Sequence, residues 1–244
     1  MISPTSAPGT ARARERLIFA LDLPTLEQAE EAVDALAGEV GVFKVGLELF
    51  VKAGPPAVTR AARYGHPVFL DLKLHDIEAT VDGAVGSAAT LGARYLTLHA
   101  GGGPGMIERA VRRAEAESPE LRILAVTVLT SLTQADLRAV GVQDSPADQV
   151  LRLARLAINS GAHGLVCSAE EVSTLRGALG SAPLLVTPGI RPLGSASQDQ
   201  KRTSTPGAAI EGGASLLVVG RPIRDAKDRV QAARELVSEI EAAL

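Results

Sequence analysis

The segment from Asp71 to Asp76 places a lysine between two carboxylates. Its pattern is Asp71-x-Lys73-x-x-Asp76, and it begins within an apolar run that is typical of a buried strand. Residues two apart on a strand share a face, so we expect Asp71 and Lys73 about 6.6 Å apart on one side, with Asp76 just past the strand. A lysine flanked by carboxylates keeps its proton at neutral pH. Such a lysine suits delivery of a proton to carbon or oxygen and does not suit a Schiff-base nucleophile.

Two more charged residues, Asp22 and Lys44, interrupt apolar runs earlier in the chain. Only five of the 25 basic residues are lysines, and two of the five, Lys44 and Lys73, lie within predicted strands. Burying an unpaired ammonium group is costly, so each lysine must have carboxylate neighbours. A structural ion pair would explain any single pair equally well. Five such charges on three strand ends favour a catalytic set.

The elements that must position these charges alternate between strand and helix. Short apolar runs predict eight buried strands, which begin at Leu17, Val42, Val68, Tyr95, Ile123, Gly164, Leu184 and Leu216. Helical patterns lie between them, with capping residues at Thr25, Ser145, Ser168 and Thr205.

The spacing of these elements predicts an α/β fold, a (β/α)8 TIM barrel. Eight units of about 30 residues give the length of such a barrel, whose active site lies at the C-terminal ends of its strands. A doubly wound open sheet is less favoured, because no GxGxxG turn follows the first strand. Residues 1–16 show no apolar periodicity and are expected to form a disordered or loosely packed tail. Residues 17–244 are expected to form a single catalytic domain.

Glycine and arginine follow the last two predicted strands, where barrels commonly bind phosphate. Gly220 and Arg221 follow the eighth strand, and Gly189 and Arg191 follow the seventh. Backbone N–H groups and a guanidinium can grip a phosphate there. Residues 191–205 are long, polar and aperiodic, so we expect a lid that closes over this phosphate.

Composition excludes several classes of function. The net charge is −3 and aromatic residues make up 2% of the chain, which argues against binding a nucleic acid polymer. No run approaches the roughly 18 apolar residues of a spanning helix, so we expect a cytoplasmic protein without a membrane partner. Cys167 is the only cysteine, and no histidine pair has metal-ligand spacing, so we expect neither a disulfide nor a metal site.

The segment FLDLKLHDIEATV from Phe69 closely resembles the signature of the orotidine 5′-monophosphate (OMP) decarboxylases. Further segments agree with the bacterial form of this family in order and place, namely LIFALD, FKVGLELF, VTVLTS, VTPGIRP, the Asp199-Gln200 pair and VVGRPI. The resemblance spans the chain from about Leu17 to the C-terminus. It implies decarboxylation of OMP to UMP without a cofactor, the last step of de novo pyrimidine nucleotide synthesis.

The resemblance also implies a role for each matching residue. Lys73 would protonate C6 of the pyrimidine, Asp71 would lie beside the substrate carboxylate, and Lys44 and Asp76 would complete an alternating row of charges. Asp22 and Lys44 would contact the ribose. Thr130 and Ser131 would lie near the pyrimidine. The phosphate and ring-closing end would be formed by Arg191, Gln200, Gly220 and Arg221. The resemblance further implies a homodimer, in which Asp76 and Thr80 would lie in the site of the other subunit.

Glu78 and Ala79 stand where the family usually has Pro and Asn. Without the proline, the turn after the third strand is expected to be less rigid, while Asp76 and Thr80 are retained. Two other functions stay open from the sequence. One is a magnesium-dependent sugar-phosphate decarboxylase or synthase of the same barrel superfamily, and the other is a catalytically silent barrel that binds nucleotides.

Overall fold

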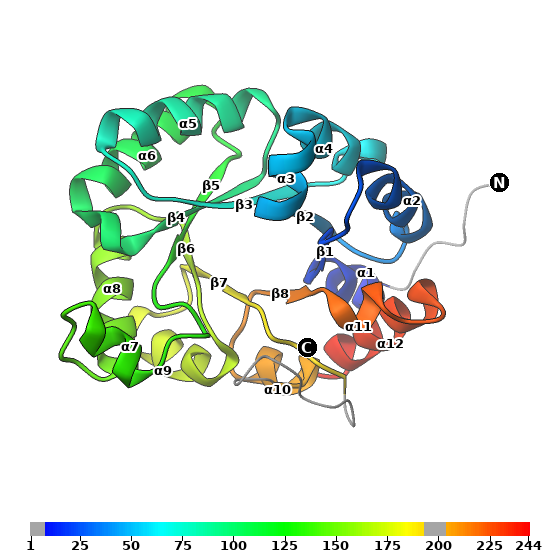
Figure 1. The fold of residues 1–244 in the computed structure, drawn as a ribbon. Helices are drawn as coiled ribbons and strands as arrows, with labels where there is room; N and C mark the ends of the chain where they lie inside the picture. The colour runs from blue at the N-terminus through cyan, green and yellow to red at the C-terminus, as the bar shows by residue number, and fades with distance from the viewer. Residues whose placement is uncertain (1–7, 193–203) are drawn as a thin grey trace.

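The computed structural model describes residues 8–192 and 204–244, in which eight parallel strands close into a barrel (Figure 1). Each strand pairs with its neighbours in sequence, and β8 pairs with β1. The strands are β1 Leu17–Ala20, β2 Val42–Gly46, β3 Val68–Leu74, β4 Tyr95–His99, β5 Arg122–Val126, β6 Gly164–Val166, β7 Leu184–Thr187 and β8 Leu216–Val219. The predicted TIM barrel is therefore confirmed.

Helices surround the barrel and connect successive strands (Figure 1). They are α1 Pro8–Glu15, α2 Leu26–Leu36, α3 Leu47–Ala53, α4 Pro55–Ala61, α5 Glu78–Thr90, α6 Gly103–Glu117, α7 Gln134–Ala139, α8 Pro146–Asn159, α9 Ala169–Leu179, α10 Pro206–Glu211, α11 Arg221–Arg224 and α12 Arg229–Glu241, with short 3-10 turns η1 Arg63–Gly65 and η2 Ala100–Gly102.

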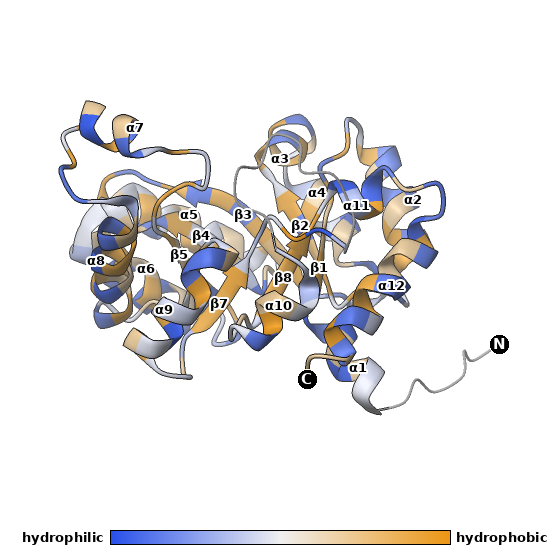
Figure 2. Cartoon of the chain, turned by 90° about the horizontal axis from the view of Figure 1, so that it is seen from below, coloured by the Kyte–Doolittle hydropathy of each residue, from blue (hydrophilic) through white to orange (hydrophobic). Residues whose placement is uncertain are grey.

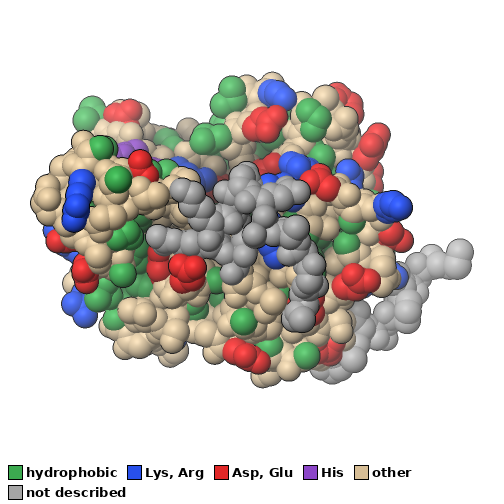
Figure 3. Space-filling view, turned by 60° about the horizontal axis from the view of Figure 1, so that its bottom comes forward, with side chains coloured by type: hydrophobic (Ala, Val, Ile, Leu, Met, Phe, Trp, Pro, Cys, Tyr) green, Lys and Arg blue, Asp and Glu red, His purple; other side chains and the backbone are tan. Residues whose placement is uncertain are grey.

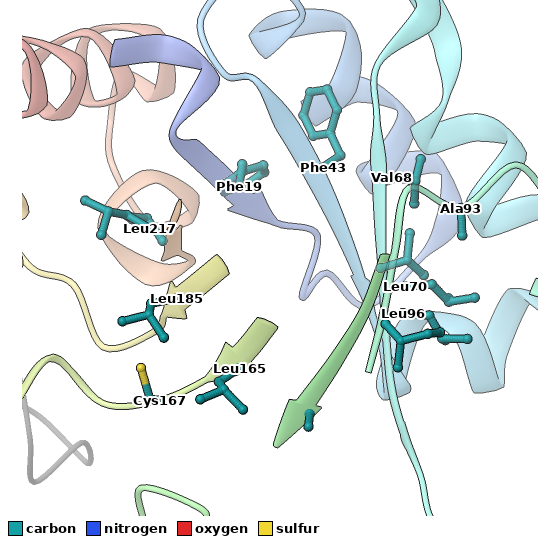
Figure 4. Packing of buried hydrophobic residues seen from close by; sticks show 14 of the residues in the cluster. Phe19, Phe43, Val68, Leu70, Ala93, Leu96, Leu165, Cys167, Leu185 and Leu217 are labelled. Carbon is teal, nitrogen blue, oxygen red and sulfur yellow. The ribbon is translucent and has the colours of Figure 1, made fainter. Parts of the chain in front are cut away.

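Alternating residues of the strands fill two separate cores. The barrel interior holds the cluster Ile18, Val42, Phe69, Leu124, Val186 and Leu216. Intervening residues, such as Phe19, Phe43, Leu70, Leu96 and Leu165, point outward and pack beneath the helices (Figure 4). Both faces of a parallel strand are buried in such a barrel, which is why the strands are continuous apolar runs in the sequence.

The helices turn their apolar sides to this outer core, so that apolar and polar residues alternate around them (Figure 2). Their starts agree with the predicted caps. The hydroxyl oxygens of Thr25, Ser145 and Thr205 accept hydrogen bonds from backbone N–H groups of the first helical turn. Ser168 forms a capping arrangement with Glu171, whose carboxylate accepts from the Ser168 N–H at 2.9 Å.

The described part of the expected loose tail forms a helix. Pro8–Glu15 forms α1, which contacts α12. Ala13 is fully buried, and the Thr10 hydroxyl donates to the Glu241 carboxylate at 3.0 Å. So short a helix carries little apolar pattern and is stabilised by tertiary packing, which a local sequence pattern does not report.

No helix in the described part of the chain is long and apolar enough to cross a membrane.

Candidate active site

Four charged side chains form an alternating row at the C-terminal ends of β1, β2 and β3. The Lys44 ammonium donates to Asp22 Oδ1 at 3.0 Å and lies 3.8 Å from Asp71 Oδ2. The Lys73 ammonium donates to the same Asp71 oxygen at 2.8 Å. Asp71 therefore lies between two lysines, and the row runs Asp22, Lys44, Asp71, Lys73.

Strand register brings the row together. Ala20 pairs with Lys44, and Gly46 pairs with Asp71, so the ends of the three strands lie side by side. Lys44 comes two residues after Val42, and Asp71 comes two residues after Phe69. Val42 and Phe69 face the barrel interior, so Lys44 and Asp71 lie on the same side of their strands. The charged groups sit directly above this apolar layer, which is why the side chains of Lys44 and Asp71 are only 9% and 14% exposed.

Lys73 reaches the row by a different backbone path from the one its spacing predicts. Its φ is +51°, in the left-handed region that residues other than glycine rarely adopt. The pairing of β3 with β4 is irregular between Leu70 and Leu74. The Lys73 N–H donates to the hydroxyl of Thr97 on β4 at 2.9 Å, and that hydroxyl donates to Asp71 Oδ1 at 2.9 Å.

The row forms one wall of a cavity of about 640 Å³ at the barrel mouth, a size suited to a nucleotide-sized ligand. On the face of the molecule shown in Figure 3, acidic and basic side chains lie next to each other. The sequence-predicted residues that line the cavity are Asp22, Lys44, Asp71, Lys73, Thr130, Arg191, Gly220 and Arg221. Its floor is aliphatic, with Val126, Val166 and Val218.

The glycine and arginine turns follow β7 and β8. In the closed barrel these strands lie across from β3, which carries Lys73. Gly220 precedes α11, and Arg221 is the first residue of that helix. Arg191 donates from Nη1 to the Ile190 carbonyl at 2.8 Å. Ile190 forms a bridge with Ser204, so the described ends of the expected lid segment meet at the cavity rim. The rest of that segment, with Gln200, lies outside the described residues.

Three predicted site residues are not brought into this cavity by their own chain. Asp76 is exposed, and its Oδ1 accepts from the Ile77 N–H at 2.7 Å. It lines a separate open groove together with His75 and Ile77. Thr80, on α5, and Ser131, after β5, are both exposed and lie outside the set of described residues that line the cavity.

The structure adds three residues that the sequence patterns did not single out. Thr97 is fully buried and bridges Asp71 and Lys73. Gly46 leaves space for the row, because a Cβ there would lie 2.9 Å from Lys44 Nζ. Arg224 lines the cavity, and its Nη1 donates to the Asp22 carbonyl at 3.3 Å. Of these three, only Thr97 could have been predicted from the sequence. It lies two residues after Tyr95 on the same strand, and the alternation of side chains places both inside the barrel.

Two further titratable groups beside the cavity favour their neutral forms. Burial lowers the pKa of His99, and the nearby His75 and Lys73 lower it further. Burial also raises the pKa of the Cys167 thiol to about 12. Cys167 lies in the outer core beside Leu165 and Leu185 (Figure 4). It is therefore an inert thiol at neutral pH.

Among residues 8–192 and 204–244, no cluster of three or more His, Cys, Asp or Glu side chains has the arrangement of a metal site. The two carboxylates in the cavity are instead paired with lysines, Asp22 with Lys44 and Asp71 with Lys73.

The chain has close relatives among known proteins. It is 56% identical over 224 residues to the orotidine 5′-phosphate decarboxylase of Anaeromyxobacter sp. (strain K), a match that covers 92% of this chain and 97% of the relative. It is 49% identical over 224 residues to that of Opitutus terrae, with the same coverage. The crystal structure of orotidine 5′-phosphate decarboxylase from Lactobacillus acidophilus superposes with a TM-score of 0.82 at 40% identity, covering 92% of this chain and 98% of the other.

A family model described as "Orotidine 5'-phosphate decarboxylase / HUMPS family" matches residues 15–236, which include every residue of the charged row and both glycine and arginine turns. With these matches and the row at the mouth of a TIM barrel, the chain belongs to the orotidine 5′-phosphate decarboxylase / HUMPS family.

Proposed function

We propose that the protein is an orotidine 5′-phosphate decarboxylase that converts OMP to UMP, with Lys73 as the proton donor. The observation that carries this proposal is the row Asp22, Lys44, Asp71, Lys73 at the mouth of the barrel. Relatives that are 56% and 49% identical in sequence have this activity by name.

The reaction requires charge stabilisation at one carbon. The bond between C6 of the pyrimidine and its carboxylate breaks, CO₂ departs, and the electron pair stays on C6. Lys73 then transfers a proton from Nζ to C6, which forms UMP and leaves a neutral amine that regains a proton from solvent. Before the transfer, the ammonium stabilises the negative charge that develops at C6.

Asp71 and Lys44 hold Lys73 in place for this step. Asp71 accepts from Lys73 at 2.8 Å and is restrained on its other side by Lys44. The walls of the cavity exclude much of the water around Asp71, so fixed charges act there more strongly than they would in bulk solvent. A preorganised ammonium does not have to reorient as the carbanion forms.

The other end of the cavity suits the nucleotide's phosphate and ribose. Arg191, Gly220 and Arg221 supply guanidinium and backbone N–H donors after the last two strands. By family resemblance Asp22 and Lys44 contact the ribose hydroxyls. By family resemblance Gln200 is assigned to the phosphate end and Thr130 and Ser131 to the pyrimidine.

The assay follows the absorbance of OMP over time, with and without a chelator. Lys73→Ala is expected to reduce kcat by at least about a thousandfold, while UMP still binds. Lys227→Ala is the matched control. It removes an exposed lysine in the loop between α11 and α12. Turnover by Lys73→Ala near that of the control would overturn the assignment. Loss of wild-type activity on chelation would favour the magnesium-dependent sugar-phosphate chemistry, and no turnover of OMP would favour a silent nucleotide-binding barrel.

We further propose that the enzyme is a homodimer in which Asp76 and Thr80 complete the neighbouring site. Asp76 lies outside its own chain's cavity, beside Ile77, whose side chain is 71% exposed. Leu47 and Val51 on α3 are also exposed at this end of the barrel. A partner subunit seated over this end of the barrel would cover these apolar side chains.

Complementation between two inactive variants tests this arrangement. Lys73→Ala and Asp76→Asn homodimers are unfolded together, refolded and assayed. If Asp76 acts in the partner's site, each mixed dimer has one intact site, and about a quarter of wild-type activity returns. If Asp76 acts in its own chain's site, no mixed dimer has an intact site and activity does not return.

A further inference from the structure

Thr97 occupies an unusual place in the barrel, opposite an irregular stretch of β3. Leu70 pairs with Leu96, and the next pair is Leu74 with Leu98. Three residues of β3 therefore face a single residue of β4, and that residue is Thr97. The extra length lies at the segment that carries Asp71 and Lys73.

The Thr97 hydroxyl bonds to one backbone group and one side chain of this irregular stretch. It accepts from the Lys73 N–H at 2.9 Å and donates to Asp71 Oδ1 at 2.9 Å. Thr97 is fully buried, so water does not compete for either bond. A hydroxyl has a single hydrogen, and here that hydrogen is committed to the carboxylate.

These two bonds act on the backbone of Lys73 and on the carboxylate that the Lys73 ammonium contacts. Lys73 has a φ of +51°, which a lysine adopts only where the surroundings impose it. A buried N–H group needs an acceptor, and in this conformation the Lys73 N–H has one in the Thr97 hydroxyl. On the other side, the bond to Oδ1 orients the Asp71 carboxylate so that Oδ2 meets both lysines, at 2.8 Å and 3.8 Å.

We propose that Thr97 is a positioning residue that fixes the Lys73 ammonium and the Asp71 carboxylate in their reactive arrangement. Thr97 is not among the described residues that line the cavity, so it acts through Asp71 and Lys73 and not on the substrate. The inference rests on the proposed role of Lys73 as proton donor.

Three variants test it. Thr97→Val keeps the shape of the side chain and removes both bonds, Thr97→Ser keeps both bonds, and Thr127→Val is the control. Thr127 is a buried threonine whose hydroxyl has no hydrogen-bond partner in the described part of the chain, and it is not placed in the site. Leaving the Lys73 N–H and the carboxylate unsatisfied is expected to lower kcat of Thr97→Val by about ten- to a hundredfold. Thr97→Ser and the control are expected to stay within about threefold of wild type.

The split between turnover and binding separates positioning from general damage. Because the phosphate and ribose contacts are untouched, UMP is expected to bind Thr97→Val as it binds wild type. Equal kcat for Thr97→Val and Thr127→Val would overturn the proposal, as would equal losses in Thr97→Val and Thr97→Ser. If thermal melting shows that Thr97→Val does not fold, Thr97→Ala replaces it, and activity equal to that of Thr97→Ser then overturns the proposal. Failure of the proposed function would be seen separately, as Lys73→Ala turning over OMP like wild type.

Discussion

Gly46 is the position where one added methyl group is expected to disturb the charged row most directly. It is the last residue of β2, it is buried, and it pairs with Asp71. A Cβ at this position would lie 2.9 Å from Lys44 Nζ and 3.1 Å from Asp22 Oδ1. The backbone itself accepts alanine, because φ is −93° and ψ is 179°, an extended conformation. The effect of Gly46→Ala should therefore fall on the ion pair and not on the strand.

The size of the effect follows from these distances. An unstrained contact needs about 3.5 Å, so the Lys44 ammonium must move by about 0.6 Å. It already lies 3.8 Å from Asp71 and 3.0 Å from Asp22, and the methyl group presses on this ion pair from the side. A misplacement of about 1 Å in an active site can cost a hundredfold in rate, so we expect kcat/KM to fall by about tenfold.

The assay is steady-state decarboxylation of OMP, with thermal melting to monitor the fold. Gly177→Ala is the matched control, because Gly177 lies within α9 and a Cβ there meets no atom within 4 Å. We expect the control to keep wild-type kcat/KM and to be at least as stable as wild type, since alanine favours a helix. Wild-type kcat/KM for Gly46→Ala would refute the inference that the position of the Lys44 ammonium matters.

Three other perturbations have expected outcomes. Burial lowers the pKa of His163, whose Nδ1 accepts from the Ile123 N–H at 3.0 Å. Just below the unfolded pKa of about 6.5, the folded state therefore binds fewer protons than the unfolded state. The free energy of unfolding should thus be fully retained above that pH and fall as the pH is lowered, and His163→Asn, which keeps an acceptor but does not titrate, should show a weaker fall in urea titrations. The Cys167 thiol, with its pKa raised to about 12 by burial, should react with a thiol reagent only after unfolding, and rapid modification of the native enzyme would contradict this. Arg224→Ala, which removes the bond to the Asp22 carbonyl, should raise KM more than it lowers kcat, and a selective loss of kcat would show that Arg224 acts on the chemical step.

Much of the barrel and most of the charged row could be predicted from the sequence, for a physical reason. A strand buried on both faces must be apolar, so a charge within it stands out, as Lys44 and Asp71 do. Residues at the ends of successive strands of a barrel converge, which places these charges together without knowledge of any distance.

Features that depend on tertiary contacts were not accessible in this way. The left-handed backbone at Lys73 follows from the mismatch between β3 and β4, and its spacing from Asp71 suggested a regular strand. The role of Gly46 depends on which side chain passes over it, and α1 is stabilised by its contact with α12. The position of Asp76 outside its own cavity likewise follows from the path of the chain after β3.

The composition of the row is suited to return the site to its starting state in the proposed mechanism. Two carboxylates and two ammonium groups make the row neutral before reaction, which limits the cost of enclosing four charges at the barrel mouth. In the proposed mechanism, transfer of a proton from Lys73 to C6 leaves the row with one excess negative charge, centred on Asp71 between a charged Lys44 and a neutral Lys73. The return of a proton to Lys73 restores the neutral row and the ion pair with Asp71 Oδ2 at 2.8 Å. Because the groups come from three different strands, both the proton transfer and this recovery depend on the closed barrel that sets their register.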